Sequence, residues 1–146
     1  MPSDERRSGS GYRLARPERQ EDWHAFHKIR GDAFQLRRPE EISDPNCHPL
    51  LLWHEDRPVG AIQIDNLANQ AAALRLVAID PPWQACGHGR ALLEQAESYV
   101  KDLGCRKAVV YATPEAAGFY SSAGYAEEDW DDTCLGGIVQ MLKVLD

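Results

Sequence analysis

The stretch Gln84-Ala85-Cys86-Gly87-His88-Gly89-Arg90 joins an apolar run that ends at Ile79 to an amphipathic segment that starts near Gly87. Two glycines separated by one residue allow a tight turn that gathers several backbone N–H groups at the start of a helix. The positive end of a helix is a common place for proteins to bind a diphosphate. The stretch therefore predicts a site for a cofactor that carries phosphate groups.

The segments on the two sides of this loop differ in their hydrophobic period. Residues 72–79 form an apolar run that is typical of a strand, and residues 107–112 form another. Between them, apolar residues recur at helical spacing until Gly104, a common stop signal: Leu92, Leu93, Ala96, Tyr99, Val100 and Leu103. The order strand, helix, strand predicts a parallel pair with a right-handed connection.

The remaining elements predict a mixed sheet flanked by helices, a fold of the α/β (α+β) class. We expect a strand at 12–15, a helix at about 20–34 and a hairpin of strands 50–54 and 59–67 around residues 55–58. Three prolines within residues 37–49 favour a loop with at most a short helix. Towards the end we expect a helix at 115–123 and strands at 125–131 and 138–145.

Composition limits the domain organisation. With 146 residues, of which 43% are hydrophobic, the chain can bury one core. Residues 1–11 are polar and rich in Ser and Gly, so we expect a disordered leader followed by a single domain over 12–146. The four cysteines are far apart in the sequence, which predicts neither a zinc site nor a disulfide framework.

Charge and hydropathy limit the partners. The net charge of −7 argues against nucleic-acid binding, which requires clustered Lys and Arg. No apolar run reaches the roughly 20 residues of a membrane helix, and residues 1–7 lack the apolar core of a secretory signal. We therefore expect a cytoplasmic protein that does not contact a membrane.

The glycine loop differs from two familiar nucleotide-binding motifs. A dinucleotide fingerprint requires a third glycine where Leu92 stands, and a Walker loop requires Gly-Lys-Ser/Thr, which is absent. Instead, Gln84, Gly87 and Gly89 resemble the Q/R-x-x-G-x-G/A signature of the GNAT acetyltransferase superfamily. A second segment, Ala116 to Tyr125, is similar to the A-x-x-F-Y-x-x-x-G-F/Y segment of that family, and with the 139–143 ending the resemblance covers about half of the chain.

The resemblance implies acetyl-CoA as the cofactor. In this family the strand before the loop splays away from the next parallel strand, and the pantetheine arm binds the main chain there, at the positions of Val77 and Ile79. Backbone N–H groups of the loop would hold the diphosphate. The other cofactor-binding residues that the resemblance implies are Gln84, Ala85, Cys86, Gly87, His88, Gly89, Arg90, Thr113, Ala116 and Phe119.

The resemblance also implies the chemistry, which is direct attack of a primary amine on the thioester in a ternary complex. Tyr120 matches the family tyrosine near the CoA sulfur, so we expect it to be the catalytic residue, as the general acid for the departing thiolate. The N–H of Val77 or of a neighbour would stabilise the oxyanion. The resemblance implies no metal.

The sequence departs from the family pattern at two places. Many members carry a glutamate on the strand before the loop, but no acidic residue occurs between Asn66 and Ile79. The candidates for the general base are therefore three other residues, Asp65, His54 and Glu127, while a water chain or an amine that is already partly neutral at working pH would need none of them. The second departure is Thr113, which stands where the family often has an asparagine.

Several alternatives follow from these observations. The missing glutamate also fits a non-catalytic acyl-CoA-binding module or sensor, and a longer acyl group is a third possibility. Arg75 either holds a substrate carboxylate or pairs with a surface acid, and Cys86 is either a reactive thiol or an inert side chain. The acceptor is a small-molecule or peptide amine, and exposed sheet edges allow a homodimer.

Overall fold

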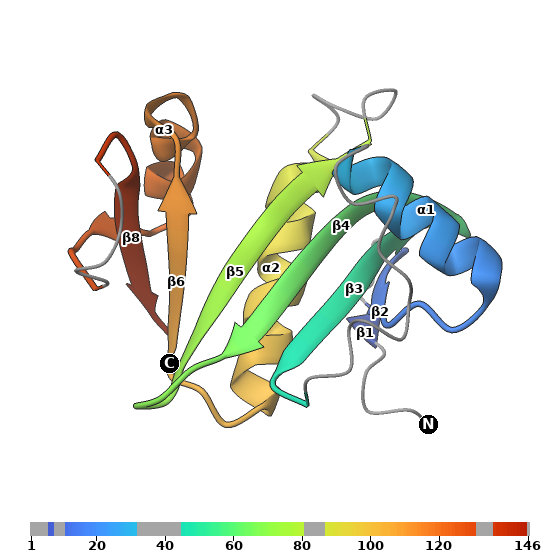
Figure 1. Ribbon diagram of the computed structural model, residues 1–146, viewed down its shortest axis with the longest axis horizontal. Helices are drawn as coiled ribbons and strands as arrows, with labels where there is room; N and C mark the ends of the chain where they lie inside the picture. Colours follow the sequence, from blue (N-terminus) through green and yellow to red (C-terminus); the bar gives the residue numbers. More distant parts are fainter. Residues whose placement is uncertain (1–5, 8–10, 32–44, 81–86, 131–135, 146) are drawn as a thin grey trace.

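A mixed eight-stranded sheet runs through the residues that the computed structural model describes, namely 6–7, 11–31, 45–80, 87–130 and 136–145 (Figure 1). The strand order is β1-β2-β3-β4-β5-β6-β8-β7. In chain order the elements are β1 (Arg6–Arg7), β2 (Tyr12–Ala15), α1 (Gln20–Arg30), β3 (Cys47–His54), β4 (Arg57–Asn66), β5 (Ala71–Ile79), α2 (His88–Asp102), β6 (Lys107–Ala112), α3 (Pro114–Ser122), β7 (Ala126–Glu127) and β8 (Val139–Val144).

Helices cover both faces of the sheet because successive strand residues point to opposite sides. Leu50 and Leu52 of β3 belong to the larger core, which includes Leu92 and Val100 of α2. Leu51, which lies between them in the strand, packs in a smaller core with Phe26 of α1. The two helices therefore lie on opposite faces of the sheet, as Figure 1 shows.

The parallel strands β5 and β6 separate after a short paired section. The register joins Ala71 to Lys107 and continues to Leu74 and Val110, and no pair is recorded beyond these residues (Figure 1). On the other side of β5 the register with β4 shifts. Arg75 pairs with Gln63 and Ala78 pairs with Ala61, so β5 has one residue more than β4 between these two pairs. Leu76, inside this shift, has a φ of +57°, which marks a β-bulge in the strand.

The structure confirms the fold class, the mixed sheet and the splayed parallel pair. The prediction for residues 37–49 is wrong in part, because β3 begins at Cys47 and includes Pro49. Proline is tolerated there because β2 pairs only with residues 51–54 of β3, which leaves Pro49 on an edge of the ladder.

Three further boundaries differ from the expectation. Helix α1 ends at Arg30, where Gly31 takes a φ of +101°, and residues 32–34 lie outside the described residues. The strand expected at 125–131 is reduced to Ala126–Glu127. Within the expected leader, Arg6 and Arg7 form β1 by antiparallel pairing with β2.

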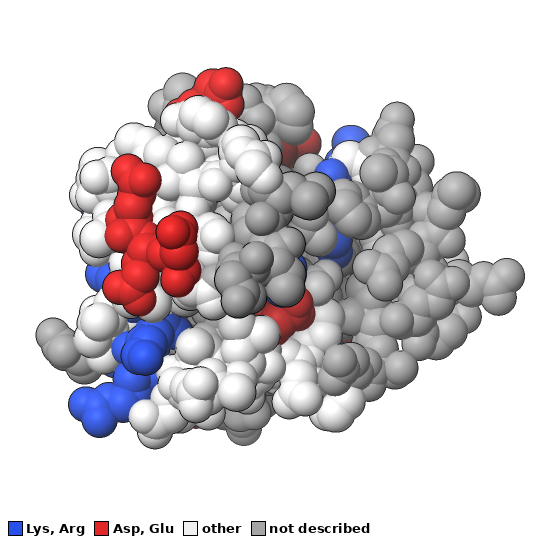
Figure 2. Space-filling view, turned by 60° about the vertical axis from the view of Figure 1, so that its left-hand side comes forward, with Lys and Arg blue, Asp and Glu red and all other residues white. Residues whose placement is uncertain are grey.

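The described surface carries charges of both signs. Figure 2 shows acidic and basic side chains in small groups, with an acidic group and a basic group close together at the left of the view. None of the described helices is long and apolar enough to cross a membrane.

Candidate functional site

A cavity of about 770 Å³ lies at the beginning of α2, and its lining includes Gly87, Gly89 and Arg90. Gly87 caps the helix with a φ of +83° and makes no side-chain capping bond, and the first turn carries no acidic residue. Gly89 allows a close approach, because a Cβ there would lie 3.3 Å from Cζ of Phe119. The cavity therefore meets the positive end of α2, where no side chain of the described residues makes a capping hydrogen bond.

A second cavity, of about 500 Å³, lies where β5 and β6 separate. Its lining includes Leu76 at the bulge, Arg75, and Tyr111 near the end of β6. Leu76 and Val77 have no partner in the register of β4 or β6. The bulge and the splay together leave a section of β5 main chain outside both ladders, beside a cavity.

The two cavities meet at three shared residues, Val77, Ala116 and Tyr120. Tyr120 is 7% exposed, and its ring packs against the rings of Phe119 and Tyr125. Burial raises the pKa of the Tyr120 phenol above its ordinary value, so the group is protonated at neutral pH. The structure thus places a protonated phenol between the helix terminus and the gap in the sheet.

Helix α3 holds Tyr120 in this position. Its N-cap is Thr113, whose Oγ1 accepts a hydrogen bond from the N–H of Ala116 at 3.3 Å, and Pro114 follows at the first helical position. Thr113 also lines the cavity between β5 and β6. Its hydroxyl thus has a structural role in addition to any contact with a ligand.

The side chain of His88 packs against β2 and does not line either of the two cavities. It is 6% exposed, and Nδ1 lies 2.8 Å from the Tyr12 hydroxyl on β2. The His54 ring, stacked on Tyr12, is 4.9 Å from the His88 ring. Burial and the neighbouring His54 lower the pKa of His88. His88 therefore lines neither of the two cavities, although it is the first residue of α2.

The candidates for a general base occupy different places. Asp65 forms an ion pair with Arg75, with 2.6 Å between Oδ2 and Nε. Pairing with an acid is one of the two roles expected for Arg75. His54 is in the cluster with Tyr12 and His88, and Glu127 is exposed on β7. None of the three lines either cavity.

Most of the predicted cofactor-binding positions lie around one cavity. Val77, Ile79, Gly87, Gly89, Arg90, Ala116, Phe119 and Tyr120 line the cavity at α2. Gln84, Ala85 and Cys86 lie outside the described residues. Sequence reasoning did not identify Leu74, Leu76, Ala78, Tyr111 or Ala112 as lining residues. Their spacing is that of ordinary strand residues, and only the bulge and the splay expose them to a cavity.

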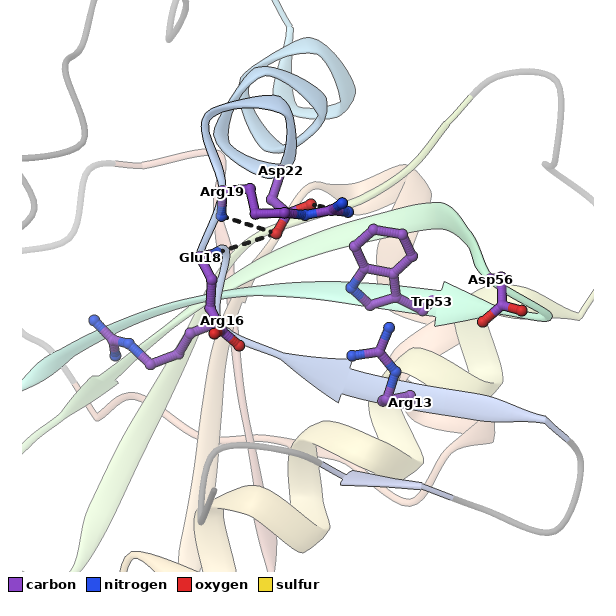
Figure 3. A pocket seen from close by; sticks show the side chains of 7 residues that line it. All are labelled: Arg13, Arg16, Glu18, Arg19, Asp22, Trp53 and Asp56. Carbon is purple, nitrogen blue, oxygen red and sulfur yellow. Dashed lines mark hydrogen bonds and ion pairs between the residues drawn. The ribbon is translucent and has the colours of Figure 1, made fainter. Parts of the chain in front are cut away.

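A polar cavity of about 290 Å³ lies elsewhere, between β2, β3 and the start of α1 (Figure 3). Arg13 lies over the ring of Trp53, with 5.0 Å between Cζ and the ring centroid. Asp22 accepts hydrogen bonds from the N–H groups of Glu18 and Arg19, which stabilises the start of α1. The cavity shares no residue with the two described above, and its charged groups act in part as a helix cap.

The described residues contain no group of three or more His, Cys, Asp or Glu side chains that could hold a metal ion. Among the described residues that line the cavity at α2, the charged side chain is that of Arg90, whose Nη2 lies 3.4 Å from Oγ of Ser122.

Comparison with known proteins gives a consistent result. The model of the acetyltransferase (GNAT) family matches residues 11–125. A protein of Bacillus subtilis (strain 168), named as a candidate acetyltransferase, is 25% identical over 132 residues, which are 84% of this chain and 88% of the relative.

Two solved structures have a similar fold at low sequence identity. The PaiA N-acetyltransferase of Thermoplasma acidophilum, in complex with coenzyme A, has a TM-score of 0.68 at 19% identity over 91% of this chain and 98% of its own. A chimera of the spermidine N-acetyltransferase SpeG from Vibrio cholerae and hSSAT has a TM-score of 0.72 at 18% identity, over 92% of this chain and 96% of its own.

Proposed function

We propose that this chain, which belongs to the acetyltransferase (GNAT) family, transfers an acetyl group from acetyl-CoA to a primary amine by direct attack in a ternary complex. The observation that carries the proposal is the position of Tyr120, which lines both the cavity at α2 and the cavity between β5 and β6. A protonated phenol at that junction can donate to the thiolate that leaves when the acetyl group is transferred.

The residues present fit the cofactor. In the proposal, main-chain N–H groups of Gly87, Gly89 and Arg90 bind the diphosphate at the start of α2. The main chain of Val77 and Ile79 binds the pantetheine arm, which would occupy the place of a missing strand between β5 and β6. Acetyl-CoA supplies the thioester, and the described cavity at α2, of about 770 Å³, leaves room for the arm.

The bulge in β5 has a catalytic role in this proposal. A positive φ at Leu76 turns the main chain that follows it, and neither Leu76 nor Val77 has a ladder partner. An N–H of this section can stabilise the negative charge that develops on the thioester oxygen. Tyr120 then supplies the proton to the thiolate.

Removal of the amine proton is assigned to water. The described lining of both cavities contains no carboxylate, and the carboxylate of Asp65 is engaged by Arg75. The same observation favours a second candidate function, an acyl-CoA-binding module or sensor without turnover. The acceptor in the first case is a small-molecule or peptide amine.

The test measures acetyl-CoA-dependent thiol release and product mass with a panel of amines. Tyr120→Phe is expected to lower kcat by about 10²- to 10⁴-fold while leaving acetyl-CoA affinity unchanged. Tyr99→Phe is the matched control, because the Tyr99 hydroxyl lies 3.3 Å from Nδ1 of His48 and Tyr99 lines neither cavity.

Two outcomes would contradict the proposal. Full activity of Tyr120→Phe would show that the phenol is not the acid. Tight binding of acetyl-CoA without turnover of any amine would instead support the sensor. The same panel with longer acyl-CoA donors tests the choice of acyl group.

A further inference from the structure

Arg75 is the charged side chain among the described residues that line the cavity between β5 and β6. Its guanidinium is held from two directions. Nε pairs with Oδ2 of Asp65 on β4 at 2.6 Å, and Cζ lies 5.3 Å from the centroid of the Tyr111 ring on β6. These two contacts together fix the position of the guanidinium.

Both partners of Arg75 are themselves held in place. Oδ1 of Asp65 accepts a hydrogen bond from Nε2 of Gln63 at 3.1 Å. The Tyr111 ring packs on the ring of Trp130, with 4.6 Å between centroids, and the Trp130 indole N–H donates to the carbonyl of Val110. A preorganised guanidinium loses little side-chain freedom when it binds a ligand.

The ion pair uses the inner nitrogen of Arg75 and leaves the outer edge for a ligand. Among the described residues, no hydrogen bond or ion pair is recorded for Nη1 or Nη2, and the side chain is 36% exposed. Two parallel N–H groups at the edge of a guanidinium match the two oxygens of a carboxylate. One face of the guanidinium is already covered by the Tyr111 ring, so a planar anion in the cavity would meet its edge.

We propose that Arg75 binds a carboxylate of the acceptor, so that the acceptor is an amino acid or another amine with a nearby carboxylate. Arg75 and Tyr120 line the same cavity of about 500 Å³, which allows one small molecule to reach both. The carboxylate would lie at Arg75 and the amine at the thioester beside Tyr120. This assignment rests on the proposed acetyl transfer and specifies its substrate class.

The experiment compares acceptors that differ only in the carboxylate, such as phenylalanine with 2-phenylethylamine and lysine with 1,5-diaminopentane. For the unsubstituted protein, we expect kcat/KM to be about 10- to 100-fold higher for the carboxylated member of a pair, because a bidentate charge-assisted contact contributes a difference of this order. Arg75→Gln should remove this preference by raising KM for the amino acid, with a much smaller change in kcat/KM for the carboxyl-free amine.

Two further variants separate binding from structure. Arg75→Lys keeps the charge without the planar fork and should retain a small part of the preference. Arg57→Gln, an exposed arginine of the same sheet that lines neither cavity, should retain all of it. Calorimetry with coenzyme A should give the same affinity for all three variants, which would show that each is folded.

Direct titration makes the outcome independent of turnover. The amino acids are titrated into protein saturated with coenzyme A, and binding that Arg75→Gln weakens about 10-fold or more supports the proposal. Equal use of the two members of each pair, or equal loss of both in Arg75→Gln, would overturn it, as would the absence of amino-acid binding. If amino acids bind through Arg75 but no amine is acetylated, the proposed acetyl transfer fails and the carboxylate site stands.

Discussion

Replacement of Gly87 by alanine tests whether the turn before α2 depends on a left-handed backbone. Gly87 has φ of +83° and ψ of 1°, and a Cβ built on it would meet no heavy atom within 4 Å. The whole cost of Gly87→Ala therefore comes from the backbone conformation, about 1–2 kcal/mol of unfolding free energy. For a domain of this size that loss lowers Tm by about 3–6 °C.

Gly118→Ala is the matched control, with the opposite expected sign. Gly118 lies inside α3, its φ is not in the left-handed region, and a Cβ there would also meet nothing within 4 Å. Alanine in a helix interior is more stable than glycine by about 0.5–1 kcal/mol. The same substitution should therefore destabilise the chain at one glycine and stabilise it at the other.

Urea denaturation and thermal unfolding of both variants provide the measurement. Acetyl-CoA affinity, measured by calorimetry, should fall for Gly87→Ala because a relaxed turn would redirect the N–H groups at the start of α2. If Gly87→Ala were as stable as the parent, Gly87 would not be left-handed in solution, and the N–H groups at the start of α2 would not be arranged as the diphosphate site requires.

Three other substitutions have defined expected effects. Thr113→Ala removes the cap of α3 and should lower the unfolding free energy by about 1 kcal/mol in urea denaturation, whereas Thr113→Ser should restore it. Tyr125→Phe removes the 2.9 Å hydrogen bond from a buried hydroxyl to Glu97 and should cost about 1–2 kcal/mol in the same assay. Burial lowers the pKa of His88 below its ordinary value, so the native state favours the neutral ring; stability should fall as the pH decreases from 7 to 5, and His88→Gln should reduce this dependence.

Each of these has an outcome that would contradict it. A Thr113→Ala variant as stable as the parent would mean that the 3.3 Å contact does not cap the helix. No loss in Tyr125→Phe would show that Glu97 gains nothing from the hydroxyl. An unchanged pH dependence in His88→Gln would mean that the imidazole is solvated rather than buried against Tyr12.

Sequence reasoning identified the elements of the fold whose signals are local. The apolar stripe of α2 and its stop at Gly104 depend only on helical period, and the hairpin of β3 and β4 depends on two apolar runs around a turn. Boundaries were less accurate where a long-range pairing decides the state. Cys47 to Pro49 became strand because β4 lies beside them, and Arg6–Arg7 became strand because β2 does.

For the candidate site, the motifs located most of the residues around the cavity at α2. They could not show where individual side chains point. His88 belongs to the loop motif, yet its ring packs on Tyr12, because the first turn of α2 faces β2 at that position. Arg75 could pair with an acid or face a ligand, and the register of β4 and β5 brought Asp65 to it while leaving it on the cavity wall.

The sequence by itself determined the order of strands and helices, the glycine turn before α2 and the type of cofactor to expect, because these depend on residues that are neighbours along the chain. Only the tertiary structure decided that β5 bulges at Leu76, and that Tyr120 stands where the two cavities join. A bulge changes which residues face each side of a sheet, and this change depends on pairing between distant strands rather than on any local pattern.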